Sequence, residues 1–168
     1  MTPAPDLSMT DDAIRALLDE PLVGVLSTLG PRGWPHSVGI FYVPRDGADG
    51  LELRMWVYGK SQKARNVERD PRASLLVEHG DPYVDLRGAL VSGTARVERD
   101  FSHVLELGKQ VYERYFFPRT GIPVDDGPAA NIERQAQKRV NIVLQAEHFA
   151  SWDHARGKDT ITVAGDQG

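Results

Sequence analysis

The stretch from Leu51 to Glu78 reads LELRMWVYGKSQKARNVERDPRASLLVE. Its first residues are rich in aromatic and branched side chains, which is typical of a strand, and Gly59 ends that run. Ser61 can cap a short helix. Asp70-Pro71 ends this helix, because the residue before a proline avoids the helical region. A second strand follows at 73–77. The stretch therefore predicts a strand, a short basic helix and a second strand.

Cationic and polar side chains gather where the predicted helix begins. They are Lys60, Ser61, Gln62, Lys63 and Arg65. The first turn of a helix has free backbone N–H groups and the positive end of the dipole, so an anion is favoured there. A phosphate would meet donors from both the backbone and charged side chains. A solvated basic helix on an otherwise acidic protein explains the same residues, and spacing alone leaves both interpretations open.

The segments 56–66 and 70–77 resemble the signature of the pyridoxamine 5'-phosphate oxidase-like superfamily. Within it, they are most similar to the branch of oxidoreductases that uses the deazaflavin coenzyme F420. The resemblance covers residues 10–155 and implies a six-stranded antiparallel split β-barrel with flanking helices. It also implies a homodimer with the cofactor between subunits, and it assigns the cofactor phosphate to Ser61, Gln62 and Lys63.

The resemblance extends to residues along the cofactor ring. The segment 33–39, Gly-Trp-Pro-His-Ser-Val-Gly, is similar to the family strand that lines the flavin. The residues then expected along the ring are His36, Ser37, Val38, Gly39, Trp56, Val57 and Tyr58. Arg87 and Trp152 are expected to come from the second subunit. Simpler explanations remain open: a barrel kink at Gly39, a surface position for His36 and a half-exposed Arg87.

The remaining elements follow from periodicity and capping residues. Thr10 can cap a helix that ends before Pro21, and Asp100 can cap one over 101–115. Further strands are expected at 22–29, 35–43, 83–98 and 140–145, turns at 30–33 and 44–50, and a short helix at 131–138. We expect one domain, with a flexible arm at 1–9, a mobile loop at 117–130 and a flexible tail at 156–168.

The whole composition limits the function further. The chain has 168 residues, a net charge of −4 and no cysteine. The negative charge does not support nucleic-acid binding, and the absence of cysteine excludes disulfides and thiolate metal sites. No apolar run approaches the roughly 18 residues that span a bilayer, and the first residues lack a signal-like hydrophobic core. We therefore expect a cytoplasmic protein that binds neither nucleic acid nor membrane.

The sequence contains none of the common catalytic motifs. It has no His-x-x-x-His pair, no Gly-x-Ser-x-Gly elbow and no Walker loop, so we expect no metal site and assign no catalytic residue. A flavin or deazaflavin needs no protein nucleophile, because the cofactor performs the chemistry.

We therefore predict a reductase that transfers a hydride from reduced F420 to an unsaturated organic substrate. Lys60 and Arg65 favour the acidic tail of F420. Two alternatives stay open. One is an FMN-dependent oxidoreductase on the same fold, and the other is a non-catalytic module that binds a flavin or haem.

Overall fold

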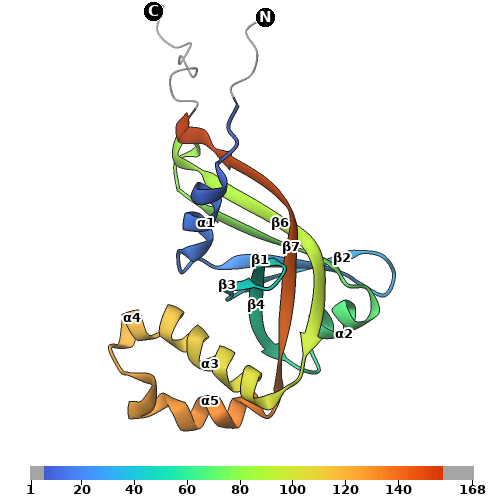
Figure 1. Cartoon of the computed structure of the whole chain (residues 1–168), viewed down its shortest axis with the longest axis vertical. Helices are drawn as coiled ribbons and strands as arrows, with labels where there is room; N and C mark the ends of the chain where they lie inside the picture. The colour runs from blue at the N-terminus through green and yellow to red at the C-terminus, as the bar shows by residue number, and fades with distance from the viewer. Residues whose placement is uncertain (1–5, 157–168) are drawn as a thin grey trace, which may run out of the picture.

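The computed structural model describes residues 6–156. A seven-stranded sheet forms the centre, with helices near both ends of its long strands (Figure 1). The strands are β1 (Gly24–Leu29), β2 (Pro35–Ile40), β3 (Val43–Gly47), β4 (Gly50–Tyr58), β5 (Arg72–His79), β6 (Arg87–Glu98) and β7 (Arg139–Asp153). The α-helices are α1 (Asp11–Asp19), α2 (Gln62–Arg69), α3 (Phe101–Tyr115), α4 (Phe117–Thr120) and α5 (Pro128–Ala136). Two 3₁₀ turns are η1 (Tyr83–Asp85) and η2 (Val124–Asp126).

The strands lie in the order β2-β1-β5-β6-β7-β4-β3, and every neighbouring pair is antiparallel. β2 and β3 occupy opposite edges, although only Phe41 and Tyr42 separate them in the chain. The sheet therefore curls until its two edges approach, as in a split barrel. The mainly β architecture with flanking helices is confirmed. The predicted count of six strands is wrong, because the sheet has seven strands and is not closed.

The additional strand arises at Tyr42, inside the strand predicted for 35–43. This side chain is fully buried, and its hydroxyl donates to the carbonyl of Leu18 at 3.0 Å. Its backbone N–H donates to the hydroxyl of Tyr115 at 3.2 Å. These bonds hold Tyr42 at the corner where the chain leaves β2 and enters β3. The turn predicted at 44–50 is correspondingly shorter, since residues 43–47 form a strand.

The main core lies on the inner face of the sheet. Strand side chains alternate between faces, and on β4 the inward residues Leu53, Met55 and Val57 are buried. Two helices cover this core, α1 through Ile14, Leu17 and Leu18, and α2 through Ala64 and Val67. On the outer face, α3 forms a smaller cluster of Leu107, Val111 and Tyr115 against Val43 and Trp56. The outer face of β4 is therefore covered by α3.

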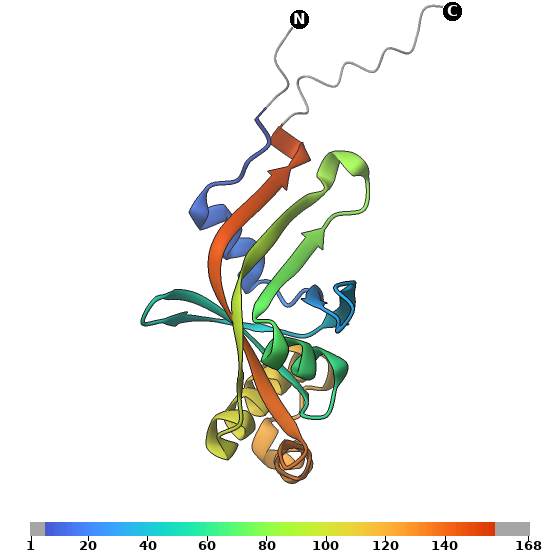
Figure 2. The ribbon, with the colours of Figure 1, turned by 90° about the vertical axis from the view of Figure 1, so that its right-hand side faces the viewer.

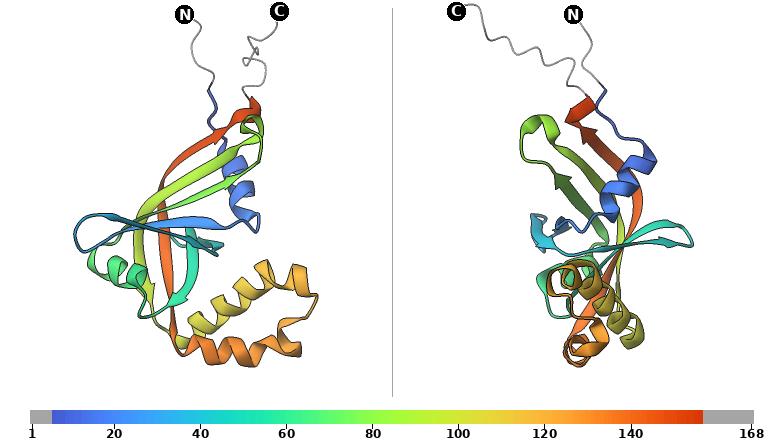
Figure 3. Two further views of the ribbon diagram at one scale, coloured as in Figure 1. Left: turned by 180° about the vertical axis from the view of Figure 1, so that it is seen from behind. Right: turned by 90° about the vertical axis from the view of Figure 1, so that its left-hand side faces the viewer.

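Helices α3, α4 and α5 form an arm at one end of the sheet, and α1 lies toward the other end (Figures 2 and 3). The side chain of Asp100 caps α3 by accepting from the N–H groups of Ser102 and His103, as predicted. The segment 117–130, predicted as a loop, contains α4, η2 and the start of α5. Its proline and glycine content reflects helix boundaries, because Gly121 ends α4 and Pro128 begins α5. The mobility of this segment stays a prediction.

The two ends of the described chain lie close together at the end of β7. The N–H of Asp153 donates to the carbonyl of Leu7 at 2.8 Å, so residues 6–9 are held against the sheet. Residues 1–5 of the predicted arm and residues 157–168 of the predicted tail lie outside the described residues. β6 begins at Arg87, later than predicted, because residues 83–85 form η1. Within residues 6–156, no helix is both long enough and apolar enough to cross a membrane.

Candidate functional site

An aromatic slot of about 530 Å³ opens between the outer face of β4, the end of β2, and helices α3 and α5. Its volume lies within the range of roughly 300–1,000 Å³ that is usual for small-molecule sites. The lining residues are Gly39, Ile40, Phe41, Trp56, Val57, Tyr58, Lys63, Gly108, Val111, Tyr112, Phe116, Asn131, Ile132, Gln135 and Arg139. Five of the residues predicted for the cofactor are among them: Gly39, Trp56, Val57, Tyr58 and Lys63.

Strand alternation places the aromatic side chains of this slot. Trp56 and Tyr58 are two residues apart on β4 and share its outer face, and Arg139 pairs directly with Tyr58 across β7. The guanidinium of Arg139 lies over both rings, 4.1 Å from the centroid of Trp56 and 4.2 Å from that of Tyr58. It also donates to the side-chain oxygen of Gln135 at 2.8 Å. Its Nη1 donates to the backbone carbonyl of Trp56 at 3.3 Å, so Arg139 is fixed in place by two rings and two hydrogen bonds.

The slot is electrostatically one-sided. Lys63 and Arg139 line it, and among the described residues no aspartate or glutamate does. Burial, and secondly the nearby guanidinium of Arg139, lowers the pKa of Lys63. Burial likewise lowers the pKa of Arg139. Each of these two cations disfavours the charged form of the other, and no carboxylate in the slot compensates them. An anionic ligand would stabilise both charges.

Several buried polar atoms at the slot and beside it have no hydrogen-bond partner within the part of the chain that the structure describes. They are Nε1 of Trp56, Nε of Arg139, Oγ of Ser61 and Nδ1 of His36. Ser61 stands at the N-cap position of α2, but the expected capping bond is absent, so its hydroxyl is free for another acceptor or donor. Buried polar groups in folded proteins are nearly always paired, so this concentration calls for an explanation.

A buried amide network joins the start of α2 to the strand predicted to line the ring. The side-chain nitrogen of Gln62 donates to Asn66 at 2.8 Å, and Asn66 donates to the hydroxyl of Thr28 at 3.0 Å. Thr28 pairs with His36 across β1 and β2. Asn66 is fully buried, which makes this arrangement rigid. The amide nitrogen of Gln62 is consequently occupied within the protein.

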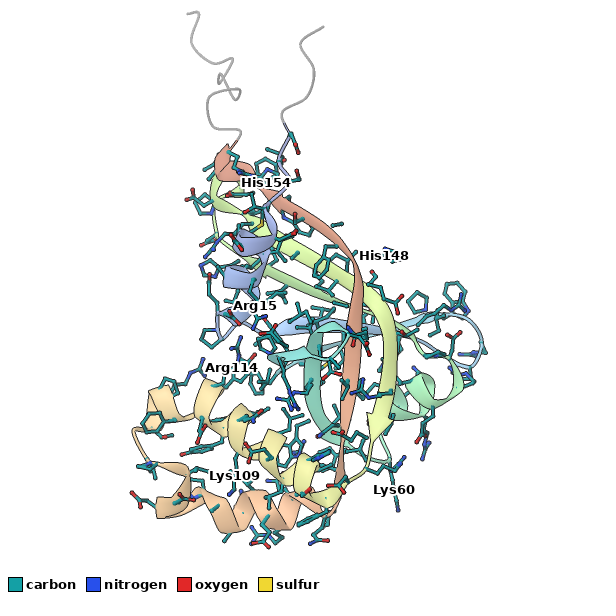
Figure 4. The ribbon with its side chains drawn as sticks, in the orientation of Figure 1. Arg15, Lys60, Lys109, Arg114, His148 and His154 are labelled. Atoms are coloured by element: carbon teal, nitrogen blue, oxygen red, sulfur yellow. The ribbon has the colours of Figure 1, made fainter. Side chains whose placement is uncertain are left out.

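Ser37 and Val38 lie in β2 but do not line the slot. The last four predicted residues divide into two groups. Lys60 and Arg65 are exposed on and beside α2 and do not line the slot, and Figure 4 shows Lys60 at the edge of the molecule. Arg87 and Trp152 lie at the far end of β6 and β7, separated from Arg139 by nearly the whole 15-residue length of β7. There Arg87 forms an ion pair with Glu20 at 2.8 Å, and the Trp152 ring lies over Gly88. One chain therefore does not bring them to the slot, and their contribution from a partner remains a prediction.

Sequence reasoning missed Arg139 and the residues that α3 and α5 contribute to the slot. Arg139 begins β7, and only its register opposite Tyr58 shows that it covers the slot. The aromatic spacing on α3 was visible, since Tyr112 and Tyr115 follow helical periodicity. In the structure Tyr112 lines the slot, whereas Tyr115 is buried and bonds to the backbone of Tyr42. Among the described residues, no group of three or more histidines and carboxylates could hold a metal ion.

The family model described as pyridoxamine 5'-phosphate oxidase matches residues 10–153. The chain belongs to this family. A conserved hypothetical protein from Mycobacterium tuberculosis, whose crystal structure is known, is 32% identical to the present chain, with a TM-score of 0.80. The match covers 100% of this chain and 98% of that one. The resemblance read from residues 56–66 and 70–77 is thus confirmed at the level of the family.

Two further solved structures show how widely this fold is used. A protein named F420 reductase is 27% identical, covers 84% of this chain and 98% of its own, and has a TM-score of 0.60. A haem storage protein from Vibrio cholerae is 17% identical, covers 87% of this chain and 95% of its own, and has a TM-score of 0.59. At that identity the second protein shows a shared fold alone. The family includes oxidoreductases, and this fold also serves other roles.

Proposed function

We propose that the protein is an F420-dependent reductase whose aromatic slot holds the deazaflavin ring. The observation that carries this proposal is the composition of the slot: Trp56 and Tyr58 on one wall, Lys63 and Arg139 beside them, and no carboxylate among the described lining residues. A flat ring system with anionic groups matches both features, since it stacks on aromatic faces and pairs with the cations. The 27% identity to a protein named F420 reductase supports the same choice.

The residues present fit such a cofactor. The unpartnered Nε1 of Trp56 and Nε of Arg139 are donors that heteroatoms of a ring can accept from. The free hydroxyl of Ser61 and the ammonium of Lys63 stand at the start of α2, where a phosphate is favoured. Lys60 and Arg65, exposed nearby, would add attraction for an acidic tail. The bound reduced deazaflavin would supply the hydride to an unsaturated organic substrate.

The protein's own residues would bind and orient the cofactor and the substrate, and they would exclude water from the slot. Phe41, Tyr112 and Phe116 line the slot, their rings contact one another, and they would provide an apolar surface against which a substrate can pack. The hydroxyl of Tyr112 donates to the carbonyl of Ile122 at 3.0 Å, which fixes its ring. Phe41 stacks on Tyr115 with ring centroids 4.3 Å apart. These contacts hold the apolar wall in one position before any ligand enters.

The proposal includes a homodimer, because a slot open on one side leaves a ring partly exposed to water. In a dimer, Arg87 and Trp152 of the second copy could cover it. Static light scattering tests this point. A monomer that still binds the cofactor tightly would overturn the dimeric site, although not the family.

A titration with F420 and with FMN tests the choice of cofactor. Trp56 lines the slot, whereas Trp34 is 74% exposed and lies outside it. We expect F420 to quench tryptophan fluorescence at lower concentration than FMN. Trp56→Phe should lose most of this quenching, and the matched variant Trp34→Phe should keep it. Tighter binding of FMN would overturn the preference for F420.

Turnover distinguishes an enzyme from a binding module. The protein is mixed with reduced F420 and a panel of enones and other activated alkenes, and reoxidation is followed by absorbance. We expect turnover with at least one member of the panel, and we expect Trp56→Phe to reduce it. Tight binding of the cofactor without turnover across the panel would favour a non-catalytic flavin-binding or haem-binding module instead.

A further inference from the structure

A second cleft, of about 580 Å³, lies on the other flank of α3 from the aromatic slot. Helix α3 turns Gly108 and Tyr112 toward the slot, and His103, Glu106 and Gln110 toward this cleft. The floor is the outer face of β3, β4, β6 and β7. The lining residues are Val43, Pro44, Arg45, Glu52, Arg54, Arg96, Glu98, His103, Glu106, Gln110 and Val143. Unlike the slot, this cleft is dominated by charged side chains of both signs.

Most of these charges are already matched inside the cleft. Arg96 forms an ion pair with Glu52 at 2.7 Å. His103 lies 3.0 Å from Glu98, and Glu98 also accepts from the amide of Asn141 at 2.9 Å. These contacts leave two arginines, Arg45 and Arg54, and one glutamate, Glu106, to be considered.

Arg54 is the exceptional residue of the cleft. Its side chain points from β4 into the outer face, and the residue is only 9% exposed. The positions opposite it on both neighbouring strands are valines, Val43 and Val143, so no carboxylate lies directly across from it. Among residues 6–156, the guanidinium of Arg54 makes one hydrogen bond, from Nη2 to the side-chain oxygen of Gln110 at 2.7 Å, and its Nε has no partner. The carboxylates of Glu52, Glu98 and Glu106 favour the charged form of Arg54 electrostatically, but none of the three forms an ion pair with it in the described structure. A buried guanidinium without a directly paired carboxylate is costly.

Arg45 adds a second cation beside Arg54. It stands opposite Glu52 on β3 and β4, but the carboxylate of Glu52 is engaged by Arg96. Within the described chain Arg45 forms no ion pair, and its side chain is exposed at the mouth of the cleft. Burial, and secondly the charge of Arg45, lowers the pKa of Arg54, and these effects outweigh the opposite influence of the carboxylates in the cleft.

We propose that this cleft is a second binding site, in which Arg54 and Arg45 hold a small oxyanion, the phosphate or carboxylate group of a metabolite. The guanidinium of Arg54 presents a buried Nε–H donor, and a planar guanidinium binds two oxygens of one oxyanion side by side. Gln110 supports this geometry, because its oxygen accepts from Arg54 while its nitrogen donates to Glu106 at 2.8 Å. The amide thereby separates Glu106 from the cation and leaves Arg54 available to a ligand.

The site is independent of the cofactor proposed for the slot. The two clefts share helix α3 and strands β4 and β7, so occupancy of one cleft could influence the other through these elements. No residue lines both clefts. The test is therefore made in the Lys63→Ala variant, where binding of phosphate at the start of α2 is weakened, and the arginine variants of the second cleft then show which part of the remaining signal comes from that cleft.

The experiment titrates inorganic phosphate and, separately, malonate into Lys63→Ala protein, by isothermal calorimetry and by thermal unfolding at constant ionic strength. We expect saturable binding of at least one of them with a matching rise in Tm. Phosphate alone would indicate a phosphate site, malonate alone a carboxylate site, and both a general oxyanion site. Adding Arg54→Met should weaken the binding about tenfold or more, the loss expected for a charge-assisted pair. Adding Arg45→Ala should weaken it severalfold.

Arg32→Met in the same background is the matched control, because Arg32 is exposed in the turn between β1 and β2. We expect it to bind as the parent does. If Arg54→Met protein does not fold, as judged by circular dichroism, the exposed Arg45→Ala variant carries the test. Absence of saturable binding in the Lys63→Ala parent would overturn the proposal. So would equal binding by the parent and the folded arginine variants.

Discussion

The two faces of β4 differ in what their side chains lack. The inward residues Leu53, Met55 and Val57 are apolar, and their side chains are packed in the main core. The outward residues Arg54 and Trp56 each carry a buried nitrogen without a partner in the described structure. The inner face is therefore explained by folding alone. The outer face has polar groups that folding does not satisfy, and both proposed binding sites are built on it.

The largest expected effect concerns the inner face. Met55→Ala should lower the free energy of unfolding by about 2–5 kcal/mol, because it leaves a cavity beneath a fully buried side chain. Tyr58→Ala, on the outer face, should cost only about 1 kcal/mol, the scale of its contact with Arg139. Urea denaturation of both variants measures the difference. Equal losses would show that the outer face is also a structural core.

The second effect concerns the cation of the slot. Lys63→Ala should weaken binding of the cofactor by about 1–3 kcal/mol, since a charge-assisted bond to phosphate is lost. The fold should not suffer, because burial and Arg139 already disfavour the charged form of Lys63. Lys138→Ala is the matched control, an exposed lysine next to Arg139 that does not line the slot. An unchanged dissociation constant in Lys63→Ala would remove this residue from the site.

The third effect separates a glycine kept for a ligand from one kept for the fold. A Cβ at Gly39 would meet only the side chain of Val23, at 3.7 Å, so packing does not require glycine there. A Cβ at Gly93 would lie 1.9 Å from the carbonyl oxygen of Gln145, at the bulge between β6 and β7. Gly39→Ala should leave the stability of the fold unchanged and weaken the binding of the cofactor by about 1 kcal/mol. Gly93→Ala should lose stability. A destabilised Gly39→Ala protein would favour a structural kink instead.

The sequence predicted the inner face better than the outer face, and the reason is physical. The aromatic and branched side chains of residues 51–58 and the capping residues Thr10 and Asp100 are local signals, and the structure confirms the elements that they indicate. The corner at Tyr42 depends on bonds to Leu18 and Tyr115, which lie far away in the sequence. The predicted turn at 44–50 therefore missed β3, and the strand count was one too low.

In the candidate site, too, the residues within a local motif were predicted and those placed by tertiary pairing were not. The motif at 56–63 indicated Trp56, Tyr58 and Lys63, and all three line the slot. Arg139 was not found, because its place over Trp56 and Tyr58 follows from the register of β4 and β7. The cleft at Arg54 was not found either, since an arginine within an apolar strand carries no sign of the valines that face it. Tertiary pairing decides these positions, and local pattern does not.

The smallest expected effect is a dependence of cofactor affinity on pH. The pKa of Lys63 in the folded protein is lowered below 10.5, the value for a free lysine. Protonated Lys63 therefore destabilises the folded protein, and this destabilisation is lost as the pH rises from the lowered pKa to 10.5. An anionic cofactor favours the protonated form, so the affinity should fall as the pH rises from neutral toward 10.5. Arg139 stays charged throughout this range. Calorimetric titrations at several pH values, in wild type and in Lys63→Ala, measure the trend. The variant should show a flatter profile, and an equally steep one would assign the titration to the cofactor or to another group.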